Sequence, residues 1–209
     1  MQKKTSAVLY YVHDPMCSWC WGFRPVWLQV KAKLKDTVNI RYLLGGLADD
    51  SDQPMPVSMQ KMIESTWLKI EQDIPGTKFN YDFWRHCKPR RSTYPACRAI
   101  IAAQLQGKRY SVRMLTAIQH AYYQQAKNPS NTTTLIQLSA DIGLNVEKFK
   151  NDFFSDKCND LFQQQMQHAR GLGVSSFPSL VLSHNQSNTM IHIDYNNDET
   201  IVSSILALI

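Results

Sequence analysis

Cys17 and Cys20 stand in a Cys-X-X-Cys spacing where an apolar run ends and a helical pattern begins. Residues 7–12 are continuously apolar and aromatic, which predicts a strand covered on both faces within a parallel or mixed sheet. From Cys17 onward, apolar residues recur at steps of three and four, which predicts a helix packed on that sheet. The chain must therefore fold so that a strand delivers the two cysteines to the start of a helix.

The start of a helix gives this pair of cysteines a chemical use. Residues three apart lie on one face of a helix, so the two sulfur atoms can reach bonding distance. At a helix N-terminus, free N–H groups and the helix dipole stabilise a thiolate and lower the pKa of its thiol. Cys17 is therefore the predicted nucleophile. Cys20, one turn further in, is the predicted resolving thiol that releases the reduced substrate from a mixed disulfide.

A zinc site is the alternative interpretation of the pair. Zinc takes four ligands, commonly from two Cys-X-X-Cys pairs or from one pair and two closely spaced histidines. Cys87 and Cys97 are ten residues apart and the six histidines stand singly, so the sequence favours redox chemistry. We expect no metal and no tightly bound cofactor, with glutathione or another thiol as electron donor.

The hydrophobic periodicity divides the chain into three parts. Residues 38–44 predict a second strand, which completes a β-α-β unit with the first strand and helix. Residues 56–169 are almost entirely helical in pattern. Two further strands in a hairpin and a last helix follow. We therefore predict an α/β protein in which residues 1–55 and 170–209 form one discontinuous domain and residues 56–169 an inserted helical domain.

The first inserted helix carries an apolar stripe that is expected to pack in the helical domain. The stripe consists of Met59, Met62, Ile63, Thr66, Trp67 and Ile70.

Charge and apolar content narrow the class of protein. Hydrophobic residues make up 44% of the 209 residues, enough for a sizeable core. The net charge is +6, and the basic residues are scattered apart from Arg85, His86, Lys88, Arg90 and Arg91. Such a stretch is typical of a solvated surface, and we favour this interpretation over a patch that binds nucleic acid. The run at 7–12 is too short for a signal peptide, and no segment approaches a membrane span, so we expect a cytoplasmic protein.

Two sequence segments together resemble the DsbA-like branch of the thioredoxin superfamily. They are YYVHDPMCSWCWGFRPVW and GVSSFPSLVL, with a long helical segment between them. The chain is most similar to cytosolic, FrnE-like members of that branch. The resemblance implies a thioredoxin-like fold with an all-helical insertion domain, in which Pro25 kinks the first helix and Pro178 is the cis-proline. It also implies a protein-disulfide oxidoreductase or isomerase that acts on protein, peptide or small-molecule disulfides.

The same resemblance implies a substrate-binding surface. Ser176, Phe177 and Pro178 would face the two sulfur atoms, and Phe177 would offer backbone groups to an extended substrate, as in strand addition. Ser18 and Trp19, between the cysteines, would lie on this surface. On the residues alone, Pro178 equally fits an ordinary proline at the start of a strand, and Trp19 equally fits a packing residue.

The sequence leaves open which residue exchanges protons with Cys17 and Cys20. Many thioredoxin-fold relatives carry a buried acidic residue six positions before the first cysteine, where this chain has Tyr11. His13 and Asp14 are the nearest titratable residues. A packed histidine and a loop-capping aspartate are the favoured interpretation of these two, and a role in catalysis is the alternative.

The remaining cysteines allow a second redox pair. Cys97 could face the active site, and the basic neighbours of Cys87 would favour its thiolate. Buried single cysteines, including Cys158, are the more common arrangement for helical positions so far apart.

Two other functions stay open at this point. Glutathione-dependent isomerases and transferases of the kappa class share the architecture, but generally have serine where Cys17 stands. A non-catalytic thioredoxin-fold module, binding a protein partner through the basic stretch near Arg90, is the third possibility.

Overall fold

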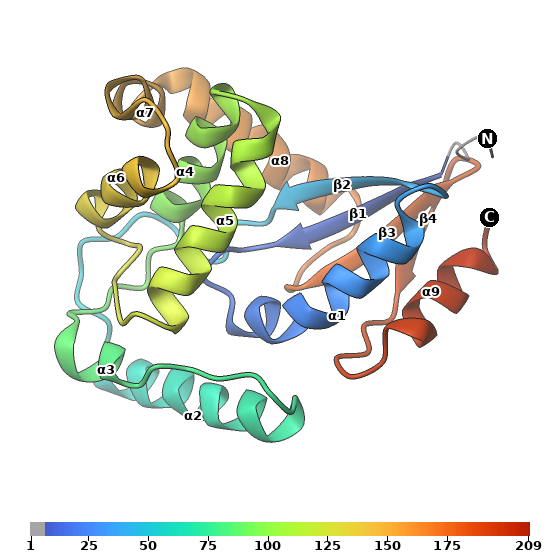
Figure 1. Ribbon diagram of the computed structural model, residues 1–209, viewed down its shortest axis with the longest axis horizontal. Helices are drawn as coiled ribbons and strands as arrows, with labels where there is room; N and C mark the ends of the chain where they lie inside the picture. Colours follow the sequence, from blue (N-terminus) through green and yellow to red (C-terminus); the bar gives the residue numbers. More distant parts are fainter. Residues whose placement is uncertain (1–6) are drawn as a thin grey trace.

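The computed structural model describes residues 7–209, built around a four-stranded sheet (Figure 1). The strand order is β2-β1-β3-β4, where β1 is Val8–His13, β2 is Asn39–Leu44, β3 is Ser179–His184 and β4 is Ser187–Ile191. β1 pairs parallel with β2 and antiparallel with β3, and β3 and β4 form an antiparallel hairpin. The predicted mixed sheet and the predicted hairpin are confirmed.

Both faces of β1 are covered, which explains its continuous apolar sequence. Leu9 and Tyr11 pack against α1 (Ser18–Leu34) and α9 (Asp198–Leu206) on one face. Their neighbours along the strand point to the other face. There Tyr10 packs with the end of α8 (Asp156–Gly171). The strand therefore has no solvent face on which polar residues could alternate.

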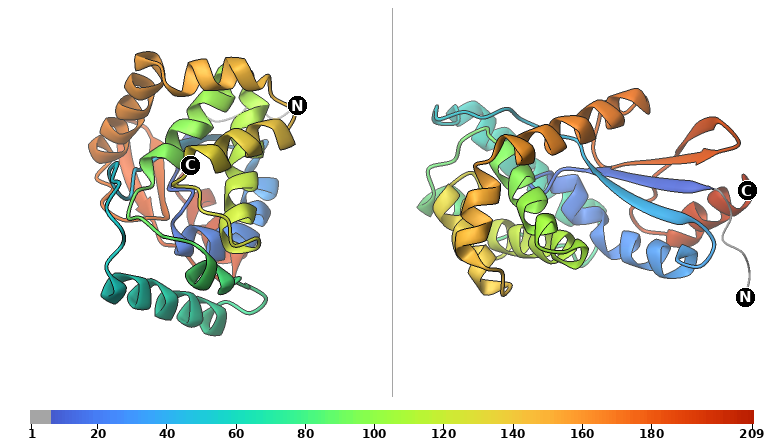
Figure 2. Two further views of the ribbon diagram at one scale, coloured as in Figure 1. Left: turned by 90° about the vertical axis from the view of Figure 1, so that its left-hand side faces the viewer. Right: turned by 90° about the horizontal axis from the view of Figure 1, so that it is seen from above.

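The helices between β2 and β3 gather mostly beyond the carboxyl ends of β1 and β2, while the end of α8 lies over one face of the sheet, as two further views show (Figure 2). Besides α8 they are α2 (Val57–Asp73), α3 (Asp82–His86), α4 (Tyr94–Leu105), α5 (Lys108–Tyr123), α6 (Thr132–Asp141) and α7 (Val146–Phe153). The predicted α/β class with a helical insertion is confirmed. The short helix α3 was not predicted, because five residues are too few for a periodic pattern.

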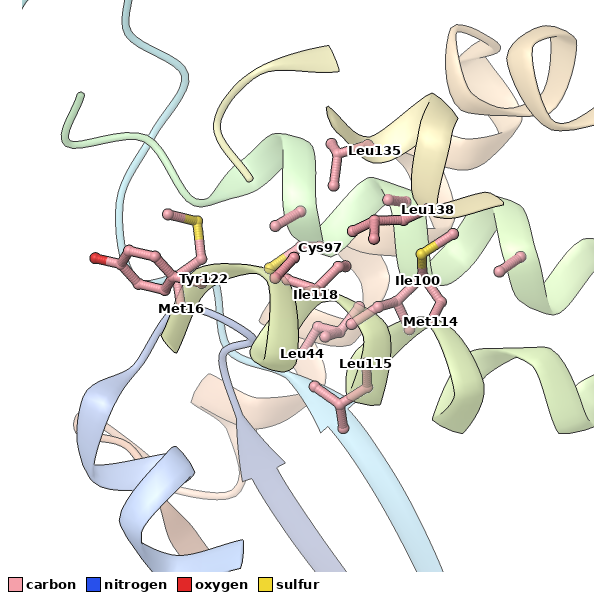
Figure 3. Close-up of a cluster of buried hydrophobic side chains, with 14 of the residues drawn as sticks. Met16, Leu44, Cys97, Ile100, Met114, Leu115, Ile118, Tyr122, Leu135 and Leu138 are labelled. Carbon is pink, nitrogen blue, oxygen red and sulfur yellow. The ribbon is translucent and has the colours of Figure 1, made fainter. Parts of the chain in front are cut away.

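The core of the helical segment reaches into the sheet domain (Figure 3). Met16, from the turn before α1, and Leu44, at the end of β2, belong to the same buried cluster as Cys97, Met114 and Ile118. Because this cluster is continuous across the expected boundary, the division at residues 56 and 169 stays a prediction. Residues 1–6 of the predicted first segment lie outside the described part of the chain. None of the described helices is long and apolar enough to span a membrane.

Candidate active site at Cys17 and Cys20

Cys17 is the N-cap residue of α1. Its backbone is extended, and its sulfur accepts a hydrogen bond from the N–H of Cys20 at 3.4 Å. The thiol donates in turn to the carbonyl oxygen of Phe177 at 3.3 Å. The sulfur therefore lies where helix N–H groups stabilise a thiolate. Only 5% of Cys17 is exposed, which limits attack to a substrate that enters a shaped cleft.

Cys20 lies directly behind Cys17 and is fully buried. Burial raises the pKa of the Cys20 thiol well above its ordinary value, and the neighbouring Cys17 raises it further. The backbone N–H of Asp14 acts in the opposite direction but does not outweigh burial. Cys20 is therefore held as a thiol, out of reach of an external substrate and within reach of Cys17.

The loop before β3 closes over the cysteine pair. The peptide bond between Phe177 and Pro178 is cis. Phe177 is partly buried and its carbonyl accepts from Cys17, whereas Ser176 is exposed. A Cβ atom on Gly45 would lie 1.9 Å from the Phe177 ring. Gly45 immediately follows β2, and a side chain at this position would collide with Phe177.

A cleft of about 380 Å³ opens at Cys17. The structure brings five of the predicted site residues to its lining: Cys17, Ser18, Trp19, Ser176 and Phe177. Pro178 is buried and Cys20 lies beneath, so neither is on the lining. Ser18 is already engaged, because its hydroxyl accepts from Trp67 Nε1 at 2.8 Å. Trp19 is half-buried with its ring against Tyr195.

Helix α2 supplies the opposite wall of the cleft, which the sequence did not indicate. Within the expected packing stripe, only Trp67 and Ile70 are buried, while Met62 is 58% exposed. Met62, Ile63 and Thr66 line the cleft. The apolar periodicity of α2 was the available signal, but a stripe cannot tell core from binding surface.

Three buried or half-buried tyrosines surround the dithiol. Tyr11, Tyr123 and Tyr195 each have a raised pKa, caused first by burial, and both cysteines contribute to the rise. For Tyr123 the neighbouring Tyr122 adds to the rise. Tyr11 stands at the position where many thioredoxin-fold relatives carry the buried acid, and its closeness to Cys20 contributes to its raised pKa.

Asp14 is fully buried and holds three segments together. Its carboxylate accepts from the backbone N–H groups of Met16 and Leu47 at 2.8 Å each, and from Thr93 Oγ1 at 2.7 Å. Cys97 Sγ donates to the same carboxylate at 3.5 Å. These contacts match the favoured interpretation of Asp14 as a loop cap. Burial raises its pKa, although the four hydrogen bonds oppose the rise.

The other cysteines make separate contacts. All five cysteines are free thiols, and besides Cys97 with Asp14, Cys87 donates to Ala126 and Cys158 to Arg98, both through backbone carbonyls. No disulfide joins them in the structure. The expectation that basic neighbours favour the Cys87 thiolate is wrong, because burial raises the pKa of that thiol.

The basic stretch is less available than its sequence suggests. Arg90 pairs with Asp52 at 2.7 Å and also donates to Ser130 and Asn131. Within residues 7–209, no three His, Cys, Asp or Glu side chains form a metal-binding group.

The close approach of Gly45 to Phe177 gives a testable prediction. We expect Gly45→Ala to lower the free energy of unfolding by about 2 kcal/mol, because the added methyl displaces the Phe177 ring. Urea denaturation measures this change. Gly171→Ala is the matched control, since nothing lies within 4 Å of its Cβ position, and an alanine there should leave stability unchanged or slightly increased. Equal stability of both variants would show that the Phe177 loop moves aside freely.

A mixed sheet whose first strand leads into a dithiol at a helix N-terminus, facing a cis-proline loop, defines a thioredoxin-fold protein. A family model described as "Thioredoxin" matches residues 10–203. The chain belongs to this thioredoxin family, and its structural neighbours are DsbA-like proteins, as the resemblance predicted.

The solved structures that resemble this fold include two of almost equal length. One, from Nitrosomonas europaea, is described as "a putative protein disulfide isomerase"; it has a TM-score of 0.82 and 26% identity, with 97% of this chain and 96% of that chain covered. The cytosolic disulfide reductase DsbM from Pseudomonas aeruginosa has a TM-score of 0.76 and 22% identity, with coverage of 96% and 98%. DsbM has also been solved with GSH.

Curated relatives carry a different kind of name. The ClpXP adapter protein SpxH is 25% identical over 184 residues in Halalkalibacterium halodurans and 26% identical over 180 residues in Bacillus subtilis. The matches cover 86% and 85% of this chain. This chain spans about 60% of the length of these curated relatives.

Proposed function

We propose that this protein is a thiol–disulfide oxidoreductase that acts on protein, peptide or small-molecule disulfides. The observation that carries the proposal is the position of the two sulfurs. Cys17 caps a helix at the floor of an open cleft, and Cys20 is buried one turn behind it. A nucleophile that meets the substrate and a shielded thiol that meets only the nucleophile are what a two-step exchange requires.

The exchange begins with the Cys17 thiolate attacking one sulfur of a substrate disulfide. A Cys17–substrate bond forms and the other substrate sulfur leaves as a thiolate. Cys20 then loses its proton and attacks Cys17 Sγ, so that an internal disulfide forms and the second substrate thiolate leaves. The substrate disulfide gains two electrons and the Cys17–Cys20 dithiol loses them.

Glutathione or another small thiol is the electron donor that we propose for the return step. Two donor molecules reduce the Cys17–Cys20 disulfide and leave as one oxidised disulfide, which restores both thiols. In a cytoplasmic location, which we also propose, the thiol pool favours this direction.

Cys20→Ser tests the two-step scheme. We expect the variant to accumulate a covalent Cys17–substrate adduct, because the thiol that releases the substrate is gone. Intact-protein mass spectrometry after mixing with oxidised glutathione would detect one added glutathione per chain. Cys158→Ser, a buried cysteine far from the pair in sequence, is the matched control and should instead form the internal disulfide.

The Cys20→Ser variant also distinguishes the proposed oxidoreductase from the kappa-class alternative. A glutathione-dependent isomerase needs no resolving thiol, so isomerisation that proceeds without net redox change and survives Cys20→Ser would replace our proposal.

An adapter role is a second candidate, favoured by the names of the SpxH relatives. An adapter binds its protein partner through a surface, so partner binding would not need the thiols. Stimulation of ClpXP degradation of a test protein, unchanged when Cys17 and Cys20 are both serine, would support the adapter role. The wild-type protein would at the same time show no disulfide turnover.

A further inference from the structure

A second, smaller hollow reaches Cys20 from a side that the substrate cleft does not share. Its volume is about 40 Å³, and it lies between α1 and α5. Seven residues of its lining carry polar groups, and two of them, Trp27 and Tyr42, hydrogen-bond each other; the other five are Tyr11, Cys20, Arg24, Thr116 and Gln119. None of its lining residues belongs to the cleft at Cys17. Leu28 and Val112, also on the lining, are 45% and 38% exposed, so the hollow meets the surface.

Gln119 marks this hollow as a site for a polar ligand. Only 3% of the residue is exposed, and in the described part of the chain no group hydrogen-bonds its side-chain amide. The amide faces the hollow, so water or another polar ligand there is the partner that the protein does not supply. A volume of about 40 Å³ exceeds the ~15 Å³ that a water molecule needs. The amide, the Thr116 hydroxyl and the Tyr11 hydroxyl offer such a water its partners.

The exchange proposed above leaves a proton without an acceptor. Cys20 must lose its proton before it attacks Cys17, and at that moment the substrate covers the Cys17 side. The Asp14 carboxylate is a buried base that acts on Cys20, but its oxygens already accept from Met16, Leu47 and Thr93. The acid that other thioredoxin folds carry is replaced by Tyr11, which lines the hollow together with Cys20 and whose pKa is raised by burial and by its closeness to the cysteine pair.

We propose that the hollow between α1 and α5 is the proton exit of Cys20, with a water molecule held there by Gln119 and Tyr11. The inference rests on the proposed oxidoreductase function. As Cys20 attacks, its proton passes to this water, directly or through the Tyr11 hydroxyl, and then to bulk solvent past Leu28. The new Cys17–Cys20 bond forms as the substrate thiolate leaves. In this scheme Tyr11 is a catalytic residue that relays the proton of Cys20 within the hollow that both residues line, and Gln119 is a positioning residue.

The groups that could compete for this proton come from every element around Cys20. They are Cys17 and Asp14 on the turn, Tyr11 on β1, Tyr42 on β2, Arg24 on α1, His120 and Tyr123 on α5, and Tyr195 after β4. Besides Tyr11, two of these groups also line the hollow, Arg24 and Tyr42. The Arg24 guanidinium has no acceptor atom, and the Tyr42 hydroxyl already accepts from Trp27 Nε1 at 2.9 Å.

A chromogenic aromatic disulfide separates the two steps in one stopped-flow trace. Attack by Cys17 releases the first coloured thiolate and resolution by Cys20 releases the second. We expect Tyr11→Phe and Gln119→Leu to leave the first phase unchanged and to slow the second about tenfold or more. Without the relay, resolution depends on hydroxide, so the second phase of both variants should rise about tenfold per pH unit. Tyr10→Phe, the neighbouring tyrosine on the opposite face of β1, is the matched control.

The outcomes decide between distinct conclusions. A wild-type protein without two phases overturns the proposed function itself. Two wild-type phases, with the second unchanged in Gln119→Leu and Tyr11→Phe, overturn the proton exit alone. Loss of both phases together with thermal stability in Gln119→Leu reveals a structural role for this residue instead, which also overturns the proton exit. If Tyr11→Phe fails to fold, Gln119→Leu decides, because it fills the hollow with a side chain of similar size.

Discussion

Replacing Cys17 with serine is expected to reduce disulfide turnover about a thousandfold or more. A serine hydroxyl is not ionised at neutral pH, so the helix N-terminus has no anion to stabilise. The fold should survive, because serine can keep the contacts with the Phe177 carbonyl and the Cys20 N–H. Turnover of insulin disulfides or of oxidised glutathione, measured with a coupled reductant, gives the rates.

Cys87→Ser is the matched control for this prediction. Of the five cysteines, all within the described residues, Cys87 alone is not buried, and it donates to the backbone carbonyl of Ala126 rather than to the site. Full activity in Cys87→Ser together with loss in Cys17→Ser would tie the chemistry to the predicted nucleophile. Turnover that survives in Cys17→Ser would contradict the proposed function, whatever Cys20 does.

The sheet and its first helix could be predicted because each is a short-range pattern. Residues 7–12 are apolar without interruption since α1 and α8 cover the two faces of β1. The N-cap position of Cys17 follows from the same local logic, since a strand that ends before Pro15 leaves few residues to begin the helix. No long-range contact is needed for either inference.

The cleft could not be predicted because its walls meet over long separations in sequence. Phe177 approaches Cys17 across 160 residues, and Trp67 reaches Ser18 across 49. The resemblance to a family indicated the first contact, but nothing indicated the second. Met62 is exposed because α2 buries only the side that carries Trp67 and Ile70. A helical stripe fixes which residues share a face, and tertiary structure decides what that face meets.

The contacts of Asp14 and Gln119, near the buried thiol of Cys20, also depend on tertiary structure. Asp14 could be identified as a loop cap from its place in a turn, but its bond to Cys97 joins residues 83 apart. Gln119 carries no sequence signal at all, because a glutamine in a helix is ordinarily solvated. Only its burial beside Cys20 without a protein partner distinguishes it.

Loss of stability in acid is the second large effect that we expect, and it comes from His13. The imidazole is 2% exposed, stacks on Tyr11 at 5.0 Å, and its Nδ1 has no hydrogen-bond partner in the described structure. Burial lowers the pKa of His13 from 6.5 to about 3. Above pH 6.5 the imidazole is neutral in both the folded and the unfolded chain, so His13 does not reduce the free energy of unfolding there. Below it, the unfolded chain takes up a proton that the folded chain refuses.

The unfolding free energy attributable to His13 should therefore fall as the pH drops from 6.5 towards 3, by about 5 kcal/mol in total. Asp14 works against this, because its raised pKa lets the folded chain bind a proton more readily than the unfolded chain. We expect His13 to dominate, and His13→Phe, which keeps the aromatic contacts, to flatten the profile by about 3 kcal/mol between pH 6.5 and 4. Urea denaturation across that range measures it, with His168→Phe as the control at an exposed position. A profile equally steep in His13→Phe would mean that other groups, and not the buried imidazole, set the acid limit of this fold.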